Sequence, residues 1–138
     1  MNSTNVIALD ADVLIYAAAP GYPLGGRIST LLSGENTAVG STLLLAECMI
    51  KPLRTGSEEE ADALAALLSR LDLRPCDQGV SELSVAVGVR YGLRAPDAIH
   101  LATAIDAGAT HFITNNRKDF TRQITEIDIV YPDDLPEA

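Results

Sequence analysis

The stretch that decides the fold is VIALD at residues 6–10, an apolar run that ends in an acid. An apolar run of this length predicts a buried first strand. In open α/β sheets, binding sites lie beyond the carboxyl ends of the strands, which makes Asp10 a candidate functional residue. Capping of the following helix would also explain an acid there, although Asp12, directly before an apolar triplet, is the better capping candidate.

Short β-like runs alternate with helical segments along the rest of the chain, and this pattern indicates a mainly parallel α/β sheet. Pro52 is expected to kink or end the helix that contains it, and Ser57 with Glu60 forms a capping-box sequence. We expect further strands at residues 37–40, 73–76, 111–114 and 124–130, the last at an edge. We expect helices at residues 12–18, from 25 onward, through 43–50 with Ser41 as N-cap, after Ser57, and at 80–91 and 97–107.

The 138 residues fit a single domain spanning 1–138, and 47% of them are apolar. No apolar stretch approaches the roughly 20 residues of a membrane span, and no basic segment followed by an apolar run marks a signal peptide. We therefore expect a cytoplasmic protein with no membrane association. In that reducing compartment, Cys48 and Cys76 have no metal-finger spacing and are expected to be reduced core thiols.

The formal net charge of −9 is unfavourable for a nucleic-acid enzyme, because phosphate binding requires Lys and Arg. Carboxylates that bind cations are not free negative charge, however, and bound divalent ions reverse the local sign. Basic residues also gather near one polar segment, at Arg117, Lys118 and Arg122. Tight non-specific binding to duplex DNA is not expected.

Two further acids stand in apolar surroundings. Glu47 lies inside LLLAECMI at residues 43–50, so its carboxylate must either reach solvent or be compensated. Asp97 opens a helix that is apolar nearly all round, where the helix dipole alone would favour an acid by roughly 0.3–1 kcal/mol. His100, one turn after Asp97, is interpreted as a hydrogen-bonded core residue and is left out of the site.

A fourth polar segment follows a predicted strand, FITNNRKDF at residues 112–120. Thr114, Asn116 and Asp119 can complete an oxygen-rich site, with Arg117 and Lys118 nearby for phosphate. A solvated loop whose Asn residues make turns is the alternative.

Carboxylates from separate elements, with no His/Cys cluster, are the ligands that hard cations such as Mg²⁺ need. Phosphodiester hydrolysis needs an activated water and shielding of the phosphoryl oxygens, and metal ions supply both. The chain lacks the glycine-rich phosphate loop, the nucleophile elbow, the C-x-x-C pair and the dinucleotide fingerprint. The acids therefore point to metal-dependent hydrolysis.

Four segments resemble the motifs of PIN domains. LDADVLI at residues 9–15 resembles the first, and STLLLAE at 41–47 resembles the second, whose Glu is a metal ligand. LRAPDAIHLATA at 93–104, with its central Asp97, closely resembles the third and is the most specific match. The segment 112–120 resembles the fourth. Order, spacing and length all fit, so the likeness covers almost the whole chain and extends to VapC toxins.

The resemblance implies a PIN-like three-layer α/β/α sandwich around a five-stranded, mainly parallel sheet, with the acids meeting at one edge. It implies an Mg²⁺- or Mn²⁺-dependent endoribonuclease in which Asp10, Glu47 and Asp97 hold the cation. Asn116 or Asp119 would complete the ligand shell or position water. It also implies RNA such as the loops of tRNA as substrate, a homodimer, and a small antitoxin whose peptide arm neutralises the site.

Two positions depart from the family pattern. The fourth motif commonly has Asp where this chain has Asn116, so either Asn116 contributes a neutral oxygen or Asp119 supplies the charge. The first motif often has Asn or Ser where Asp12 stands, and this extra acid could tighten metal binding or cap the helix. Thr114 would hydrogen-bond a carboxylate or the scissile phosphate.

Two other functions stay open at the level of sequence. Asn116 and the acidic balance favour a PIN-like binding module with a degraded, non-catalytic site. Asp10 and Asp12 fit the D-x-D-x-V start of a haloacid-dehalogenase-type phosphatase, although the remaining signatures of that family fit badly.

Overall fold

The computed structural model describes residues 5–136, in which five strands form one sheet in the order β3-β2-β1-β4-β5. Every neighbouring pair runs parallel. β1 lies in the centre, and β5 lies at an edge as predicted. The strands are β1 Val6–Leu9, β2 Thr37–Ser41, β3 Asp72–Arg74, β4 His111–Ile113 and β5 Asp128–Val130.

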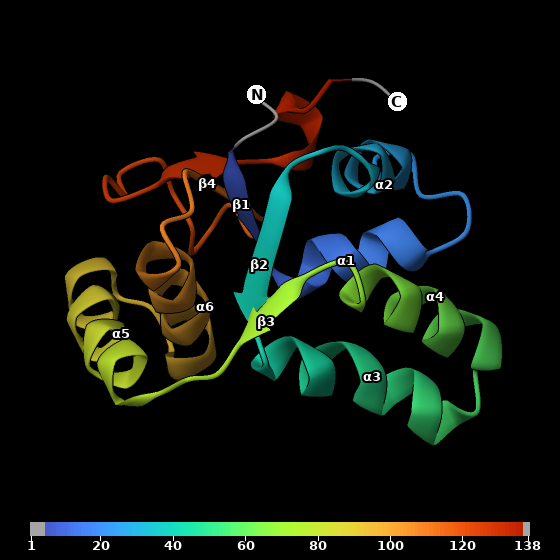
Figure 1. The fold of residues 1–138 in the computed structure, drawn as a ribbon, viewed down its shortest axis with the longest axis horizontal. Helices are drawn as coiled ribbons and strands as arrows, with labels where there is room; N and C mark the ends of the chain where they lie inside the picture. The colour runs from blue at the N-terminus through green and yellow to red at the C-terminus, as the bar shows by residue number, and fades with distance from the viewer. Residues whose placement is uncertain (1–4, 137–138) are drawn as a thin grey trace.

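Helices cover both faces of this sheet (Figure 1). α5 and α6 lie on one side, and α1 to α4 lie on the other. The result is a three-layer α/β/α sandwich with a parallel sheet, which confirms the predicted fold class. The helices are α1 Ala11–Ala18, α2 Gly25–Ser33, α3 Leu43–Thr55, α4 Glu58–Leu68, α5 Gln78–Tyr91 and α6 Ala95–Asp106, followed by the short 3₁₀ helix η1 Pro132–Asp134.

The alternation of side chains along the strands divides the interior into two cores. In β1, Ile7 and Leu9 pack with the helices α1 to α4, whereas Ala8 packs with the helices α5 and α6. In β4, Ile113 faces the first core and Phe112 the second. The central strands are therefore buried on both faces, which explains why VIALD is an unbroken apolar run rather than an alternating one.

One predicted helix end and one predicted side-chain cap differ from the structure. Pro52 does not end its helix. It is buried inside α3, which continues to Thr55. Gly56 then caps the helix in the left-handed region (φ 71°). The backbone N–H of Ser57 bonds to the Pro52 carbonyl at 2.9 Å, so the last turn is satisfied. Ser57 is the N-cap of α4 as expected, but its side chain makes no capping hydrogen bond.

The edge strands also differ from the prediction. β3 spans only three residues and ends at Arg74, and β5 begins at Asp128, whereas strands at 73–76 and 124–130 were expected. Ile124 is nevertheless buried, because it packs into the core from the loop before β5. An apolar residue at this position therefore indicates burial in the core but does not indicate a strand.

The two cysteines are free thiols. Cys48 is a buried core residue as predicted, and burial raises the pKa of its thiol to about 12. Cys76 is only partly buried but packs against the second core, so the prediction holds for it in part; it follows edge strand β3, and its Sγ lies 3.3 Å from the hydroxyl of Ser81.

The sheet order places a topological switch beside β1. From β1 the chain moves outward through β2 to β3, and it then returns to the other side of β1 to form β4 and β5. Leu9 pairs with Ile113, so the residues that follow these two strands emerge side by side. In parallel sheets, binding sites form at such a switch beyond the carboxyl ends of the strands.

Candidate functional site

Asp10 and Thr114 meet where β1 and β4 end. Both side chains are buried, Asp10 at 7% exposure and Thr114 at 0%. The Thr114 hydroxyl donates to Oδ2 of Asp10 at 3.0 Å and accepts from the backbone N–H of Asn116 at 3.0 Å. The predicted bond between Thr114 and a carboxylate is therefore present, and it joins two residues 104 positions apart.

Asp10 also caps the helix that follows it. Its Oδ1 accepts the backbone N–H of Ala11 at 2.8 Å, and its extended backbone makes it the N-cap of α1. Asp12 had been the better capping candidate, and that prediction is wrong. Asp12 lies in the first turn of α1, where its Oδ1 instead accepts the N–H of Asn115 at 3.3 Å. Both acids thus bind backbone groups at the switch.

Glu47 reaches the same region from α3, in the same helical layer as α1. It lies on α3, which leaves the carboxyl end of β2, and its side chain is 36% exposed. Its Oε1 contacts Nε2 of His100, a residue of α6 whose side chain is only 1% exposed. Sequence reasoning left the compensation of Glu47 open, and the structure supplies it through His100.

The acids interact electrostatically across these elements. Burial raises the pKa of Asp10 above the usual aspartate range, although the charge of His100 and the hydrogen bonds from Thr114 and Ala11 act in the opposite direction. Burial, followed by the charges of Asp10 and Asp119, also raises the pKa of Asp97 in the first turn of α6. The carboxylates of Asp10, Glu47, Asp97 and Asp119, which come from separate parts of the chain, therefore add to one region of negative potential.

Asp12 and His100 respond to the same field in opposite ways. Burial and then the charge of Asp10 raise the pKa of Asp12 to about 6. Burial alone would lower the pKa of His100, but its hydrogen bond and charge attraction with Glu47 raise it above the usual value. Both shifts are those expected near an excess of carboxylates.

The type of ligand fits a hard divalent cation, but the ligands are not gathered around one point. Within residues 5–136, no three His, Cys, Asp or Glu side chains lie close enough together to hold a metal ion. Asp10, Glu47 and Asp97 thus interact electrostatically, but their carboxylates do not surround a common point where a metal ion could bind. Their carboxylate oxygens are the donors that Mg²⁺ and Mn²⁺ prefer. Burial, and to a smaller extent repulsion between carboxylates, raises the pKa of Asp10 and Asp97, and a cation would offset both.

The loop after β4 holds Asn116 and Asp119 together. The Asn116 amide donates to Oδ2 of Asp119 at 3.0 Å, and its oxygen accepts the backbone N–H of Asp119 at 3.2 Å. The Asn116 oxygen is therefore engaged in a turn, as the solvated-loop alternative supposes. The Asp119 carboxylate is close enough to raise the pKa of Asp97, so the fourth segment contributes its charge through Asp119.

The basic residues of this loop are largely paired with the C-terminal segment. Arg117 donates to Asp133, and its guanidinium lies 4.3 Å from the centre of the Tyr131 ring. Arg122 donates to Asp134 and lies 4.8 Å from the same ring. Both side chains remain at least half exposed, and Lys118 is exposed as well. Much of the predicted positive charge is therefore compensated.

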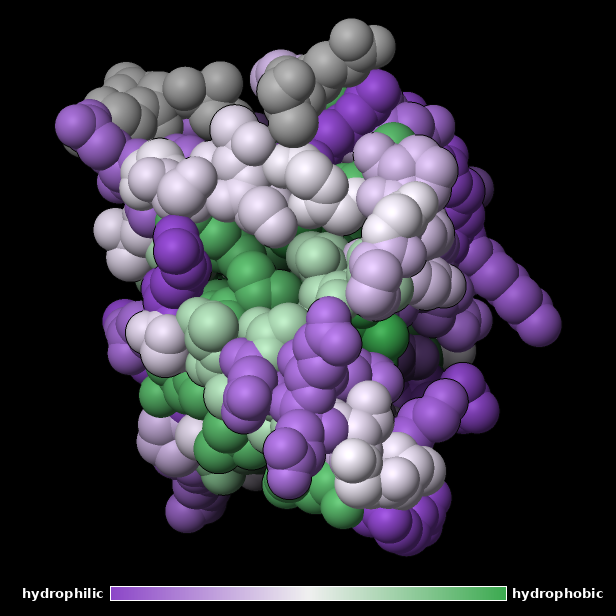
Figure 2. All heavy atoms as spheres, turned by 90° about the vertical axis from the view of Figure 1, so that its right-hand side faces the viewer, coloured by the Kyte–Doolittle hydropathy of each residue, from purple (hydrophilic) through white to green (hydrophobic). Residues whose placement is uncertain are grey.

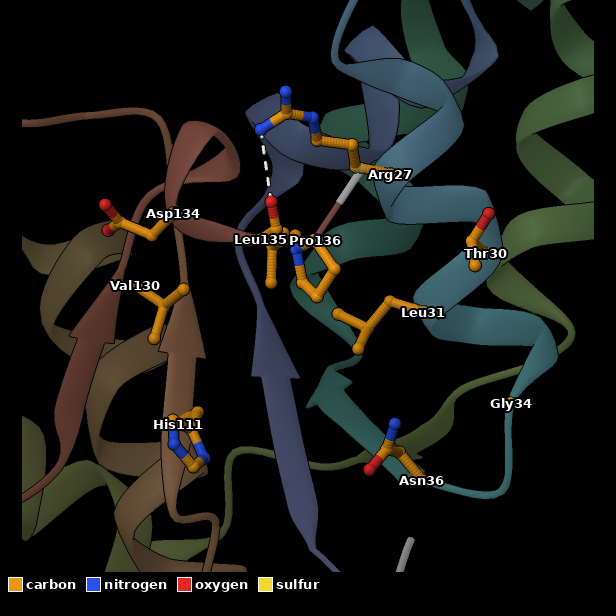
Figure 3. A pocket seen from close by; sticks show the side chains of 10 residues that line it. All are labelled: Arg27, Thr30, Leu31, Gly34, Asn36, His111, Val130, Asp134, Leu135 and Pro136. Carbon is orange, nitrogen blue, oxygen red and sulfur yellow. Dashed lines mark hydrogen bonds between the residues drawn. The ribbon is translucent and has the colours of Figure 1, made fainter. Parts of the chain in front are cut away.

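A cavity of about 530 Å³ lies away from the acids, between α2, β4 and the C-terminal segment (Figure 3). Arg27 bridges its rim by donating to the Leu135 carbonyl at 3.1 Å. None of the candidate site residues lines it, so it is separate from the acidic site.

His100 is the functional candidate that sequence reasoning missed. Its signal was present, because a carboxylate within an apolar segment, such as Glu47, favours a partner, and His100 stands one turn from Asp97. A single sequence does not reveal that α3 and α6 bring the two side chains into contact. The residues that the structure brings together are thus Asp10, Asp12, Glu47, Asp97, His100, Thr114 and Asp119.

Comparison with known proteins gives a family and a set of similar structures. The model of the family described as PIN domain matches residues 7–124. Among curated proteins, none matches the chain. No helix in residues 5–136 is long and apolar enough to cross a membrane.

Three solved structures are similar over almost the full length. A chain in a toxin–antitoxin complex from Klebsiella pneumoniae is 26% identical, with a TM-score of 0.74 over 96% of this chain and 99% of that one. VapBC2 from Rickettsia felis, bound to a DNA fragment from its promoter, is 20% identical (TM-score 0.71; 91% and 98% covered). DNA-bound VapBC from Salmonella typhimurium is 19% identical (TM-score 0.72; 94% and 99% covered).

Proposed function

The chain belongs to the PIN domain family, whose members are generally nucleases, and on that premise we propose that it is an Mg²⁺- or Mn²⁺-dependent endoribonuclease. The observation that carries this proposal is the buried carboxylate of Asp10, held at the switch of the sheet within the field of Glu47 and Asp97. The match to a chain in a toxin–antitoxin complex supports a role as the toxin of a type II toxin–antitoxin pair.

Asp10, Glu47 and Asp97 are the residues that would hold the cation. When bound, a divalent ion supplies an activated water and offsets charge on the phosphoryl oxygens. Thr114 orients the Asp10 carboxylate through its hydroxyl. Asp119, held by Asn116, adds a carboxylate beside Asp97 that can bind the attacking water.

The positive charge needed for RNA would come from the loop after β4. Lys118 is exposed there, and Arg117 is half exposed although it is paired with Asp133. A phosphate can compete for a guanidinium in such an exposed pair, because ion pairs of this kind contribute only about 0–1 kcal/mol. Phosphate binding by Arg117 and Lys118 therefore remains compatible with the net charge of −9.

A small antitoxin is the proposed partner. The similar structures include toxin–antitoxin and VapBC complexes. A peptide arm that carries Arg would be attracted to the acids of the site, and its apolar side chains would lie in a hollow of about 380 Å³ between α1, α2 and α4. Figure 2 shows apolar surface within a polar rim on this side of the molecule. The hollow is lined by Ala17, Ala18, Ser29, Ser33, Ala63, Ala66, Leu67 and Arg70.

We also propose that two copies associate. Five large apolar side chains, three on α3 and two on α5, are each at least 47% exposed, and burial against a second copy would remove them from water. Light scattering on the purified chain should then give the mass of a dimer, and a monomer at all concentrations would contradict this. These side chains are Leu45, Ile50, Leu53, Val85 and Val89.

The test of the proposed activity is cleavage of a tRNA and rRNA pool with Mg²⁺ or Mn²⁺, with 5′ ends mapped after the reaction. Wild type should cut at defined positions, EDTA should abolish cleavage, and Asp97→Asn should suppress it while the far-UV spectrum stays unchanged. The mutant also excludes a contaminating nuclease. Equal cleavage by Asp97→Asn and wild type, or no cleavage by wild type with either ion, would overturn the proposal.

A non-catalytic PIN module is the second candidate, and two observations favour it. The acids do not form a closed ligand set within the described residues, and the Asn116 oxygen is engaged in a turn. Calorimetry with millimolar Mn²⁺ separates the two: no binding, together with retained association with the antitoxin, would favour this module. The phosphatase alternative is dropped, because the chain is a PIN domain.

A further inference from the structure

One contact at the site connects the two helical layers. His100 lies on α6, on the same side of the sheet as α5, whereas Glu47 lies on α3, on the other side. Their side chains meet beyond the carboxyl ends of the strands, where Nε2 of His100 contacts Oε1 of Glu47. The imidazole is almost completely buried, at 1% exposure, and the carboxylate is 36% exposed.

The chemistry of the two groups assigns the proton between them. An ionised carboxylate only accepts hydrogen bonds, so Nε2 of His100 carries the hydrogen and donates it to Glu47. The second ring nitrogen, Nδ1, is buried and has no hydrogen-bond partner among residues 5–136. The contact with Glu47 is thus the one side-chain hydrogen bond that orients this ring in the described part of the chain.

Packing alone does not explain a histidine here. His100 lies on a helix whose neighbouring positions, such as Leu101 and Ala104, are buried and apolar. A buried ring nitrogen without a hydrogen-bond partner lowers stability. A leucine would fill the same space without that cost. The feature that a leucine lacks is the N–H directed at Glu47.

From this geometry we propose that His100 is a positioning residue that holds the Glu47 carboxylate in place for a divalent cation. Glu47 is partly exposed, and an unrestrained glutamate side chain loses considerable rotamer freedom when it is fixed. The imidazole engages Oε1 and thereby leaves Oε2 available as a ligand. Hydrogen bonds of this kind to ligand carboxylates typically change metal affinity by about 10–100-fold. This inference rests on the proposed metal-dependent function.

The position of the proton can be tested without any metal. The chain has two histidines, so a ¹⁵N-labelled His111→Gln protein shows His100 alone in a long-range ¹H–¹⁵N correlation spectrum. We expect Nε2 to be protonated and its signal to move in a Glu47→Gln variant. A proton on Nδ1 only, or a signal unaffected by Glu47→Gln, would overturn the proposal.

The effect on the cation is tested by calorimetry with Mn²⁺ on wild type, His100→Leu and His100→Gln. His100→Leu should bind Mn²⁺ at least about tenfold more weakly, and His100→Gln, which keeps an N–H donor of similar reach, should recover most of the affinity. His111→Gln is the matched control and should bind like wild type, because His111 lies at the start of β4, whereas the acids of the candidate site lie beyond the strand ends. If His100→Leu does not fold, His100→Gln and the nitrogen spectra still decide the matter.

The possible failures are distinguishable. Equal Mn²⁺ affinity in wild type and folded His100→Leu would overturn the positioning role and leave the proposed function intact. Absence of Mn²⁺ binding by wild type would overturn the metal-dependent function, and the positioning role with it, even if the spectra place the proton on Nε2.

Discussion

Asp10 performs two tasks with one carboxylate: one oxygen caps α1 and the other accepts the Thr114 hydroxyl. These bonds compensate only part of the cost of burial, since the pKa of Asp10 stays raised. The second acid of the same motif, Asp12, adds to the repulsion. Individual residues at this site thus lower the stability of the fold, as is common where function requires concentrated charge.

Removing the charge of Asp12 should stabilise the protein. Asp12 titrates near 3.8 when unperturbed and at about 6 in the folded chain, so the native state is penalised whenever this carboxyl is ionised. Asp12→Asn keeps the oxygen that accepts from Asn115 and should raise the melting temperature at pH 7.5. The difference from wild type should shrink as the pH falls from 6 toward 4, because native Asp12 then becomes protonated.

Thermal unfolding followed by circular dichroism between pH 4 and 7.5 measures that difference. Asp10 and Asp97 interact with Asp12 electrostatically, so the difference reports the charge of Asp12 together with its repulsion of these two acids. A variant that melts below wild type at pH 7.5 would show that Asp12 is stabilising, contrary to this expectation.

The hydroxyl of Thr114 should matter more for stability than its size suggests. Thr114→Val keeps the shape of the fully buried side chain but removes the donor to Asp10 and the acceptor of the Asn116 N–H. Loss of partners for buried groups costs about 1–3 kcal/mol, and urea denaturation should reveal a loss in that range. Thr114→Ser retains the hydroxyl and is the control, which should lose less stability; a Thr114→Val variant as stable as wild type would show that the two hydrogen bonds of the hydroxyl do not contribute.

For individual residues, the sequence indicates which acids are unusual, but it does not indicate which side chains they contact. Asp10, Glu47 and Asp97 were identified because an acid is unexpected beside or within an apolar segment. The role of His100 was not predicted, because a buried histidine is usual in cores and its partner is 53 positions away. The N-cap was assigned to Asp12 rather than Asp10, because the end of a strand and the start of a helix differ by one or two residues in sequence patterns.

Among the elements, the central ones were the most predictable. β1 and the helix α5 with its terminal Gly92 follow directly from apolar runs and helix signals. The edge strands β3 and β5 were placed too late or too long, because three-residue strands carry little pattern and nearby apolar residues such as Ile124 are buried from loops. Long-range packing, not local preference, determines those boundaries.

Replacement by alanine should have opposite effects on stability at Gly88, within α5, and at Gly92, the C-cap of this helix. Gly92 caps the helix at φ 66°, where an L side chain is strained, so Gly92→Ala should destabilise the protein by about 1 kcal/mol. Gly88 lies within the helix, and an added methyl would make ordinary contact with Ala98 at 3.4 Å. Gly88→Ala should therefore stabilise it by about 0.5–1 kcal/mol.

Chemical denaturation of the two variants against wild type tests this pair of signs. The two positions are one helical turn apart, so a general effect of alanine on the stability of α5 would change both variants in the same direction. Destabilisation by Gly88→Ala would mean that α5 and α6 are packed too closely for one more methyl group.

At the scale of the whole molecule, the two cores support a sheet whose switch point gathers negative charge from both helical layers. The chain as a whole carries a net charge of −9, so self-repulsion adds to the local repulsion at the site. The three-layer fold was predictable from the alternation of elements. The spacing of the acids was not, because it depends on how side chains from α1, α3 and α6 are placed relative to one another, which a pattern in the sequence does not specify.

A divalent cation should therefore stabilise the folded chain through these acids. A ligand that binds only the native state at 100 times its dissociation constant contributes about 2.7 kcal/mol, enough to raise the melting temperature by several degrees. Mn²⁺ should produce this rise in wild type, and EDTA should reverse it. Asp97→Asn should show little rise, whereas Asp128→Asn, which alters an acid that is 81% exposed at the start of β5, should respond like wild type. Equal rises in all three proteins would mean that Mn²⁺ acts by general screening of the negative surface and that Asp97 is not a ligand.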